Sequence, residues 1–202
     1  MARLDARNYS VEVIIESLLR ESADVKLRMI AECIPAIAQI SRSIVECLQA
    51  GRKVVVCGNG GSAADAQHLA AELVGKFRAR RRPLAAIALT TDTSILTAVG
   101  NDWSFKEIFA RQVEALGDEG DVLIAISTSG ESENVLRAID RARSMGMLAV
   151  GFVGGSTSRM DSRVDICLKI PSTETPRIQE GHEVAAHIVC DLVERAICDG
   201  DD

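Results

Sequence analysis

The chain has 202 residues, of which 47% are hydrophobic and 26% are charged, so it is long enough for one sizeable globular domain with a real core. A formal net charge of −6 gives no overall positive field for wrapping nucleic acid or for holding an anionic membrane surface, and we expect neither as a partner. The expected partner is a small molecule or another protein.

The six cysteines lie in apolar runs, without a C-x-x-C pair or the dense spacing of a secreted disulfide scaffold, and we expect reduced, mostly buried thiols. The N-terminus, MARLDARNYS, carries charges but no apolar stretch with a small-residue cleavage site. Nowhere do eighteen apolar residues run together. We therefore expect a cytoplasmic protein.

Two helices are predicted before any strand. From Ser10 onward, apolar residues recur at helical spacing, and a second such series starts near Ile37 and runs to Gly51, which is a stop signal. Pro35 is expected to start or kink the second helix, because it cannot donate the helical hydrogen bond that an interior position requires.

After Gly51, short apolar runs that end in small polar residues alternate with helical patterns. This alternation is typical of a doubly wound parallel α/β sheet, in which ligands bind outside the carboxyl ends of the strands. No linker is long enough to divide the chain into separate domains. The predicted strands are Val54–Cys57, Leu84–Leu89, Val122–Ile126, Leu148–Val153 and Val164–Ile170.

The loop 58-GNGGSA-63 joins the first strand to a helix, and its glycines let backbone amides approach an anionic or polyhydroxyl ligand. It also matches the dinucleotide pattern G-x-G-x-x-A, but the acidic residue expected about twenty positions later is replaced by the basic stretch 78–82. A simple tight turn would explain the glycines but not Asn59 and Ser62 beside them.

The loop 127-STSGES-132 follows a second strand and precedes a helix expected to begin near Glu131. Hydroxyl and backbone donors at a helix N-terminus suit a phosphate monoester. The alternative is a plain helix N-cap, for which Ser and Thr are preferred in any case. The loop lacks the Lys-Ser/Thr of a nucleoside triphosphatase, so it is not a triphosphate-binding loop. Of the two interpretations, we favour the phosphate monoester because of the donors.

Two helix faces carry residues that could hold a metal ion. His68 and Glu72 lie four residues apart, hence one turn apart, and Gln179 and His187 lie on neighbouring faces of the last helix. Two imidazoles, a carboxylate and an amide oxygen could bind Zn²⁺ or another divalent ion. The spacing equally fits surface ion pairs, and Glu183 makes the same i, i+4 arrangement with His187.

Three further features are assigned no role in chemistry. The remaining histidine, His182, is interpreted as a polar residue at the surface or behind the site. The arginine cluster at positions 78–82 is interpreted as a solvated loop. Trp103, the only tryptophan, is expected to pack rather than to stack on a base.

Four segments, CGNGGSAADAQH, ALTTDTSILTAVGND, STSGESENV and IQEGHEVAAHIVC, occur in the same order as in phosphoheptose isomerases, which are members of the sugar isomerase (SIS) domain superfamily. The resemblance covers nearly all of residues 50–197. It implies a flavodoxin-like, doubly wound, five-stranded parallel sheet over 51–202. The N-terminal helices over 1–50 are expected to pack on this domain and in oligomer contacts, so that the two parts form one structural unit. The resemblance also implies a homotetramer with active sites near subunit contacts.

The resemblance further implies conversion of D-sedoheptulose 7-phosphate to D-glycero-D-manno-heptose 7-phosphate, the first step toward the ADP- or GDP-heptose of lipopolysaccharide and other surface glycans. It implies one Zn²⁺ per subunit, held by His68, Glu72, Gln179 and His187. Proton transfer is expected from Glu72 and His187. The implied substrate-binding residues are Asn59, Gly60, Gly61, Glu72, Asn101, Asp102, Ser127, Thr128, Ser129, Ser132 and Gln179.

Two alternatives remain open within the same superfamily. One is a DiaA-type adaptor, a non-enzymatic tetramer that binds the bacterial replication initiator, and the other is an isomerase of a different sugar phosphate. Those adaptors lack the carboxylate and the last-helix histidine, whereas this chain retains Glu72 and His187. Pro176 stands where some relatives carry a polar residue, which leaves contacts at the sugar end open.

Overall fold

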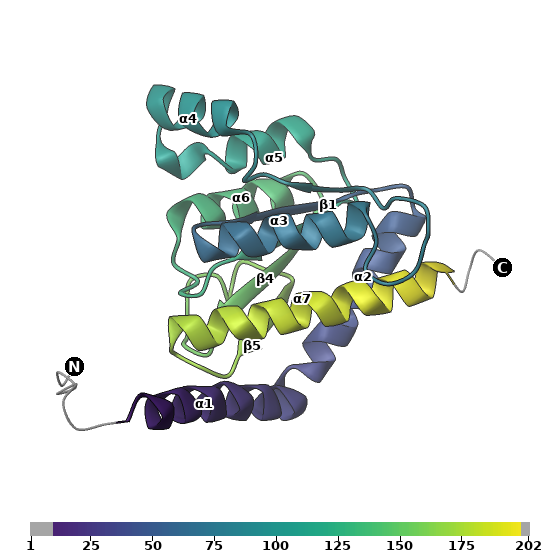
Figure 1. Cartoon of the computed structure of the whole chain (residues 1–202). Coiled ribbons are helices and arrows are strands. Elements are labelled where there is room, and N and C mark those ends of the chain that lie inside the picture. The colour runs from purple at the N-terminus through teal and green to yellow at the C-terminus, as the bar shows by residue number, and fades with distance from the viewer. Residues whose placement is uncertain (1–9, 199–202) are drawn as a thin grey trace.

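The computed structural model describes residues 10–198 (Figure 1). The stretch 1–9, which holds most of the N-terminal segment expected to lack a leader pattern, lies outside the described residues, as does 199–202. In chain order the elements are α1 (Val11–Glu32), α2 (Ile34–Gln49), β1 (Val54–Gly58), α3 (Gly61–Val74), β2 (Ala86–Ala88), α4 (Thr93–Asp102), the 3-10 turn η1 (Phe105–Glu107), α5 (Ala110–Leu116), β3 (Val122–Ile126), α6 (Glu133–Ser144), β4 (Leu148–Gly154), β5 (Ile166–Ile170) and α7 (Thr175–Cys198).

The described residues form a five-stranded, all-parallel sheet with the order β2-β1-β3-β4-β5. This order confirms the predicted flavodoxin-like sheet, and its topological switch point lies between β1 and β3. Regular pairing in β2 is shorter than predicted. The strand lies at the edge of the sheet, and the Leu84 N–H donates to the Leu73 carbonyl of the preceding helical segment instead of to a strand.

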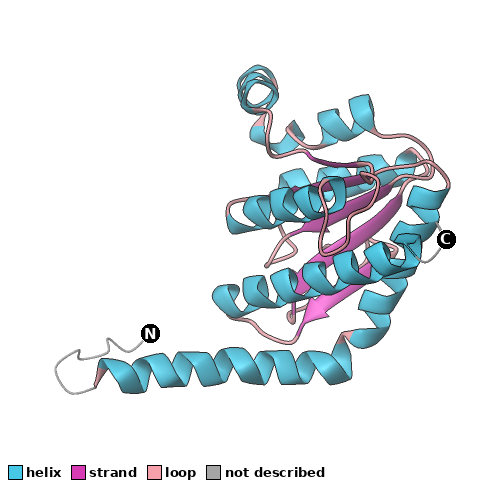
Figure 2. Ribbon diagram, turned by 45° about the vertical axis from the view of Figure 1, so that its right-hand side comes forward, coloured by secondary structure: helices cyan, strands magenta, loops and turns pink. Residues whose placement is uncertain are grey.

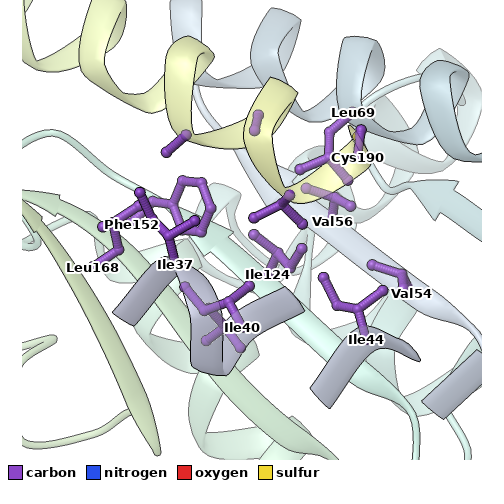
Figure 3. Close-up of a cluster of buried hydrophobic side chains, with 14 of the residues drawn as sticks. Ile37, Ile40, Ile44, Val54, Val56, Leu69, Ile124, Phe152, Leu168 and Cys190 are labelled. Atoms are coloured by element: carbon purple, nitrogen blue, oxygen red, sulfur yellow. The ribbon is translucent and has the colours of Figure 1, made fainter. Parts of the chain in front are cut away.

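Helices cover both faces of the sheet (Figure 2). On one face, α2, α3 and α7 pack against side chains such as Val56 and Ile124, as Figure 3 shows for Ile37, Ile40 and other labelled residues. On the other face, α5 and α6 pack against the alternate side chains of the same strands. Because neighbouring strand residues point to opposite faces, both sets must be apolar, and this explains the nearly continuous apolar runs of the sequence.

The N-terminal helices differ in how they pack. Pro35 lies in the first turn of α2, as predicted, and Ile40 and Ile44 of that helix are fully buried in the same cluster as the sheet. In α1 only Val25 and Met29 are buried, while many of its other apolar side chains face outward. Over residues 10–198, no helix combines the length and the apolar character needed to cross a membrane.

The cysteines are unpaired, and four of them, Cys33, Cys47, Cys57 and Cys190, are buried. Burial raises the pKa of Cys57 and of Cys190 to about 12, so both stay protonated at neutral pH. The prediction of mostly buried thiols is confirmed.

Candidate active site

The loop between β1 and α3 is a sharp turn that only glycine fits at two positions. Gly60 has a φ of +56°, a conformation that residues with a side chain rarely adopt. A Cβ on Gly58 would lie 2.6 Å from the Ser62 carbonyl oxygen. The turn therefore delivers the chain directly into α3 and leaves the first N–H groups of that helix at the carboxyl end of β1.

The loop after β3 gathers hydroxyl groups at a second helix N-terminus. Ser127 Oγ lies 3.4 Å from Ser129 Oγ and 3.2 Å from Ser132 Oγ, and Gly130, at a φ of +65°, donates its N–H to Ser127 Oγ. Helix α6 begins at Glu133, two residues later than expected, with Ser132 as its N-cap. The Ser132 side chain does not cap that helix, so its hydroxyl is oriented toward the loop instead.

These two loops lie side by side at the switch point and are tied together. Asn59 Nδ2 donates to Asn134 Oδ1 at 2.9 Å, and Asn134 Nδ2 donates to Asn59 Oδ1 at 2.8 Å. Asn134 is buried and also accepts the N–H of Val135. This reciprocal amide pair fixes the spacing between the glycine loop and the hydroxyl loop.

The two predicted ligand faces meet between α3 and α7, which run side by side (Figures 1 and 2). His68 Nε2 lies 3.0 Å from Glu72 Oε1, and the rings of His68 and His187 are 5.1 Å apart, edge to face. Ligand atoms of His68, Glu72 and His187 all lie within 4.8 Å of one another. The tertiary fold thus combines residues more than one hundred positions apart into one cluster.

Two carboxylates that the sequence reasoning did not assign to the site complete this cluster. Glu183 Oε1 lies 2.7 Å from His68 Nδ1 and 3.1 Å from His187 Nε2. Asp65 lies one turn before His68 on α3, and its Oδ2 is buried without a hydrogen-bond partner in the protein. Burial, with the nearby charge of Glu183, raises the pKa of Asp65 to about 6. The sequence signal for Asp65 was its position one helical turn before His68.

The donor set fits a divalent metal ion such as Zn²⁺. Two imidazoles and a carboxylate converge within the reach of one ion, and they are ligand types that Zn²⁺ prefers. The Glu183 carboxylate lies at His68 Nδ1, while His68 Nε2 points toward Glu72. This matches the arrangement in which a carboxylate holds one ring nitrogen of a histidine and orients the other toward a metal ion. The same side chains also lie within ion-pair distance of one another and are 22–44% exposed.

The other predicted site residues divide into two groups. The Gln179 side chain lies directly against Gly61, at the start of α3. Asn101 and Asp102 are exposed at the end of α4, where Asn101 Nδ2 donates to Asp102 Oδ1 at 2.8 Å. Both views place α4 away from α7, so these two residues are not part of the cluster within this chain (Figures 1 and 2).

His182 is not at the surface. It is 1% exposed and packs its ring 5.7 Å from that of Phe152, with Nε2 3.3 Å from the Val153 carbonyl oxygen. Burial lowers the pKa of His182 to about 4, so the ring is neutral at physiological pH. The surface interpretation is wrong because neighbouring elements bury more of the circumference of α7 than its apolar face alone.

The arginine cluster is only partly the solvated loop expected from sequence. Arg81 is an exception: its side chain is 2% exposed and its Nε lies 3.2 Å from Glu194 Oε2. Trp103 packs, but at the surface, where the Arg111 guanidinium lies 4.0 Å above its ring. With 57% of its area exposed, Trp103 is outside the core.

Comparison with known proteins gives one consistent result. The family model of the SIS domain matches residues 18–154. The chain is 51% identical to a phosphoheptose isomerase of Rhodospirillum rubrum over 91% of this chain and 97% of the relative. It is 54% identical to one of Roseiflexus over 89% and 91%. A solved phosphoheptose isomerase structure from Francisella tularensis superposes with a TM-score of 0.89 at 41% identity, covering 93% of this chain and 100% of the other.

Proposed function

Because the chain belongs to the phosphoheptose isomerase family of SIS-domain proteins, we propose that it isomerises D-sedoheptulose 7-phosphate to D-glycero-D-manno-heptose 7-phosphate at the cluster between α3 and α7. The observation that carries the site assignment is the meeting of His68, Glu72 and His187 beside two loops built for an anionic, polyhydroxyl ligand. A ketose phosphate has both of those chemical features.

In this proposal the substrate phosphate binds at 127–132. The hydroxyls of Ser127, Ser129 and Ser132, that of Thr128 and the N–H groups at the start of α6 are the donors, and the helix dipole favours the negative charge. The sugar chain then extends past Asn59, Gly60 and Gly61 toward the cluster, where Gln179 lies against Gly61. Asn101 and Asp102 are proposed to contribute from another subunit, because α4 lies away from the cluster in its own chain.

Isomerisation moves the carbonyl from C2 to C1. One proton leaves C1 and gives an enediol between C1 and C2, a proton returns to C2, and the hydroxyl proton passes from O1 to O2. We assign the two carbon proton transfers to Glu72 and His187, whose ligand atoms lie within 4.8 Å of one another. Glu183 holds the imidazoles in place through its contacts with His68 and His187.

The proposed cofactor is one Zn²⁺ per subunit, with His68, Glu72, Gln179 and His187 as ligands. When bound, the ion would supply electrophilic polarisation of the substrate oxygens. The support is the convergence of three of these side chains and the position of Gln179 on the same helix as His187.

We also propose a homotetramer in the cytoplasm whose product feeds the heptose of lipopolysaccharide or other surface glycans. The apolar side chains that α1 leaves outside support the oligomer: Val11, Leu19, Leu27 and Ile30 are each more than 60% exposed. Residues 1–50 and 51–202 are proposed to form one structural unit, since Ile40 and Ile44 share the core of the sheet. Light scattering would test the tetramer.

The test is a proton NMR time course of sedoheptulose 7-phosphate in D₂O with zinc supplied. We expect the aldoheptose product to appear with deuterium at C2, seen as the absence of its H2 resonance. We expect Glu72→Gln and His187→Asn to form no such product. Circular dichroism and light scattering must show that both variants keep the wild-type fold and assembly. A wild type that leaves the ketose unchanged, or a folded Glu72→Gln that turns it over at the wild-type rate, would refute the proposal. Capture of a replication initiator by an inactive wild type would favour the adaptor alternative.

A further inference from the structure

A buried ion pair fixes the chain that follows α3. Arg81 and Glu194 have side chains that are only 2% and 5% exposed, and Nε of Arg81 lies 3.2 Å from Oε2 of Glu194. Between Gly75 and Arg82, all residues other than Phe77 and Arg81 are exposed. The conformation of this irregular segment therefore depends on few buried contacts, and the main one is the ion pair between Arg81 and Glu194.

Each partner of the pair binds backbone groups near the active-site cluster. Arg81 donates from Nη2 to the carbonyl of Glu72 at 2.8 Å and from Nη1 to that of Leu73 at 2.9 Å, so it satisfies carbonyls at the end of α3 that have no helical partner. The Glu194 carboxylate accepts the N–H groups of Phe77, Arg78 and Ala79, at 2.9, 2.7 and 2.7 Å.

These bonds bring an aromatic ring against the second proposed proton-transfer residue. Phe77, whose N–H is held by Glu194, places its ring 5.5 Å from that of His187. Glu194 lies seven residues, about two turns, after His187 on α7, hence near the same face. One pair of side chains thus holds the main chain of Glu72 and, through Phe77, one side of the His187 ring.

We propose that Arg81 and Glu194 are positioning residues for the isomerisation: they set the relative placement of Glu72 and His187 and of a metal ion held there. This inference rests on the proposed function. Burial raises the pKa of Glu194, but the three N–H groups and Arg81 outweigh it and hold the pKa below its ordinary value, so the carboxylate is ionised at neutral pH. Arginine fits because its planar fork reaches several carbonyls at once, which lysine cannot do.

The test compares Glu194→Gln and Arg81→Lys with a matched control, Asp121→Asn. Asp121 is also a buried carboxylate that accepts two backbone N–H groups and pairs with one cation, Lys53, but it lies at the amino ends of β1 and β3, opposite the active-site loops. All three variants should lower the melting temperature. Only the first two should lower kcat, by about tenfold or more, and weaken zinc binding to substrate-free protein by a similar factor, with KM little changed.

A variant that does not fold is replaced by Phe77→Leu, which keeps the N–H bond to Glu194 and removes the ring beside His187, together with that ring's contacts with Arg78 and the core. Its expected result is a lower kcat with a melting temperature closer to wild type than that of Glu194→Gln or Arg81→Lys. The inference is overturned by folded variants that keep the wild-type kcat and zinc affinity, or by a control that loses both equally. Wild-type protein without turnover would instead count against the proposed function, while zinc affinity would still test the positioning role.

Discussion

The contact between Gly61 and Gln179 makes a specific prediction for Gly61→Ala. A Cβ at position 61 would lie 2.9 Å from Gln179 Cδ and closer still to Nε2, whereas carbon atoms in ordinary contact are about 3.5–4.0 Å apart. The Gln179 amide must therefore move by roughly 1 Å. Since it is the end of a flexible side chain, we expect the free energy of unfolding to change by less than about 1 kcal/mol, with better helix propensity offsetting part of the strain.

Activity should respond far more than stability. A displacement of about 1 Å in a positioned group costs up to about 100-fold in rate, so kcat/KM for sedoheptulose 7-phosphate should fall by about 10- to 100-fold. The assay is steady-state kinetics at saturating zinc, with thermal unfolding in parallel. A double-mutant cycle tests the cause: Gly61→Ala should add no loss in a Gln179→Ala background. Additive losses, or a folded Gly61→Ala with wild-type kcat/KM, would contradict this prediction.

Three other predictions follow from contacts in the site and behind it. Glu183→Gln should weaken zinc binding about tenfold, measured by competition with a chromophoric chelator, because His68 Nδ1 loses its carboxylate; unchanged affinity contradicts that role. Asn134→Ala should destabilise the fold by about 1–2 kcal/mol and raise KM, because the Asn59 amide loses both bonds; urea unfolding and kinetics would check this. His182, with a pKa of about 4 in the fold and an ordinary value of 6.5, binds fewer protons folded than unfolded, so stability should fall by about 2 kcal/mol from pH 7 to pH 5. His182→Leu should remove that part of the pH dependence, and an equal slope in both proteins would contradict it.

The sheet was predictable because its signal is local. Each buried parallel strand must be apolar on both faces, so a run such as Val122–Ile126 is visible within five residues of sequence. The range predicted for the edge strand β2 is too long, because Leu84, before the paired segment, donates its N–H to the helical Leu73 carbonyl instead of to a strand. Helix α6 begins two residues later than predicted because its N-cap is Ser132 and not Gly130.

The candidate site was predictable only in part, because its contacts join distant segments. Spacing placed His68 beside Glu72, but spacing cannot show that Glu183 bridges two imidazoles across two helices. The sequence predicts that Arg81 is solvated like its neighbouring arginines, because its partner Glu194 lies more than one hundred residues later. The surface alternative for His182 is wrong for a related reason: a helical pattern shows which face is most apolar, but not how far neighbouring elements cover the rest.

The loop at 127–132 contains no lysine or arginine. Its only charged side chain is Glu131, which accepts the N–H of Arg159, and the Arg159 guanidinium nearby is already paired with Glu131 and Glu133, so residues 127–132 themselves offer hydroxyls and a helix terminus to an anion. Attraction between full opposite charges weakens as ionic strength rises, and the contribution of the helix dipole is screened as well, which leaves the hydroxyl hydrogen bonds as the part least sensitive to salt. An enzyme that binds its substrate phosphate mainly through such hydroxyls would lose less affinity at high ionic strength than one that binds it through arginine or lysine.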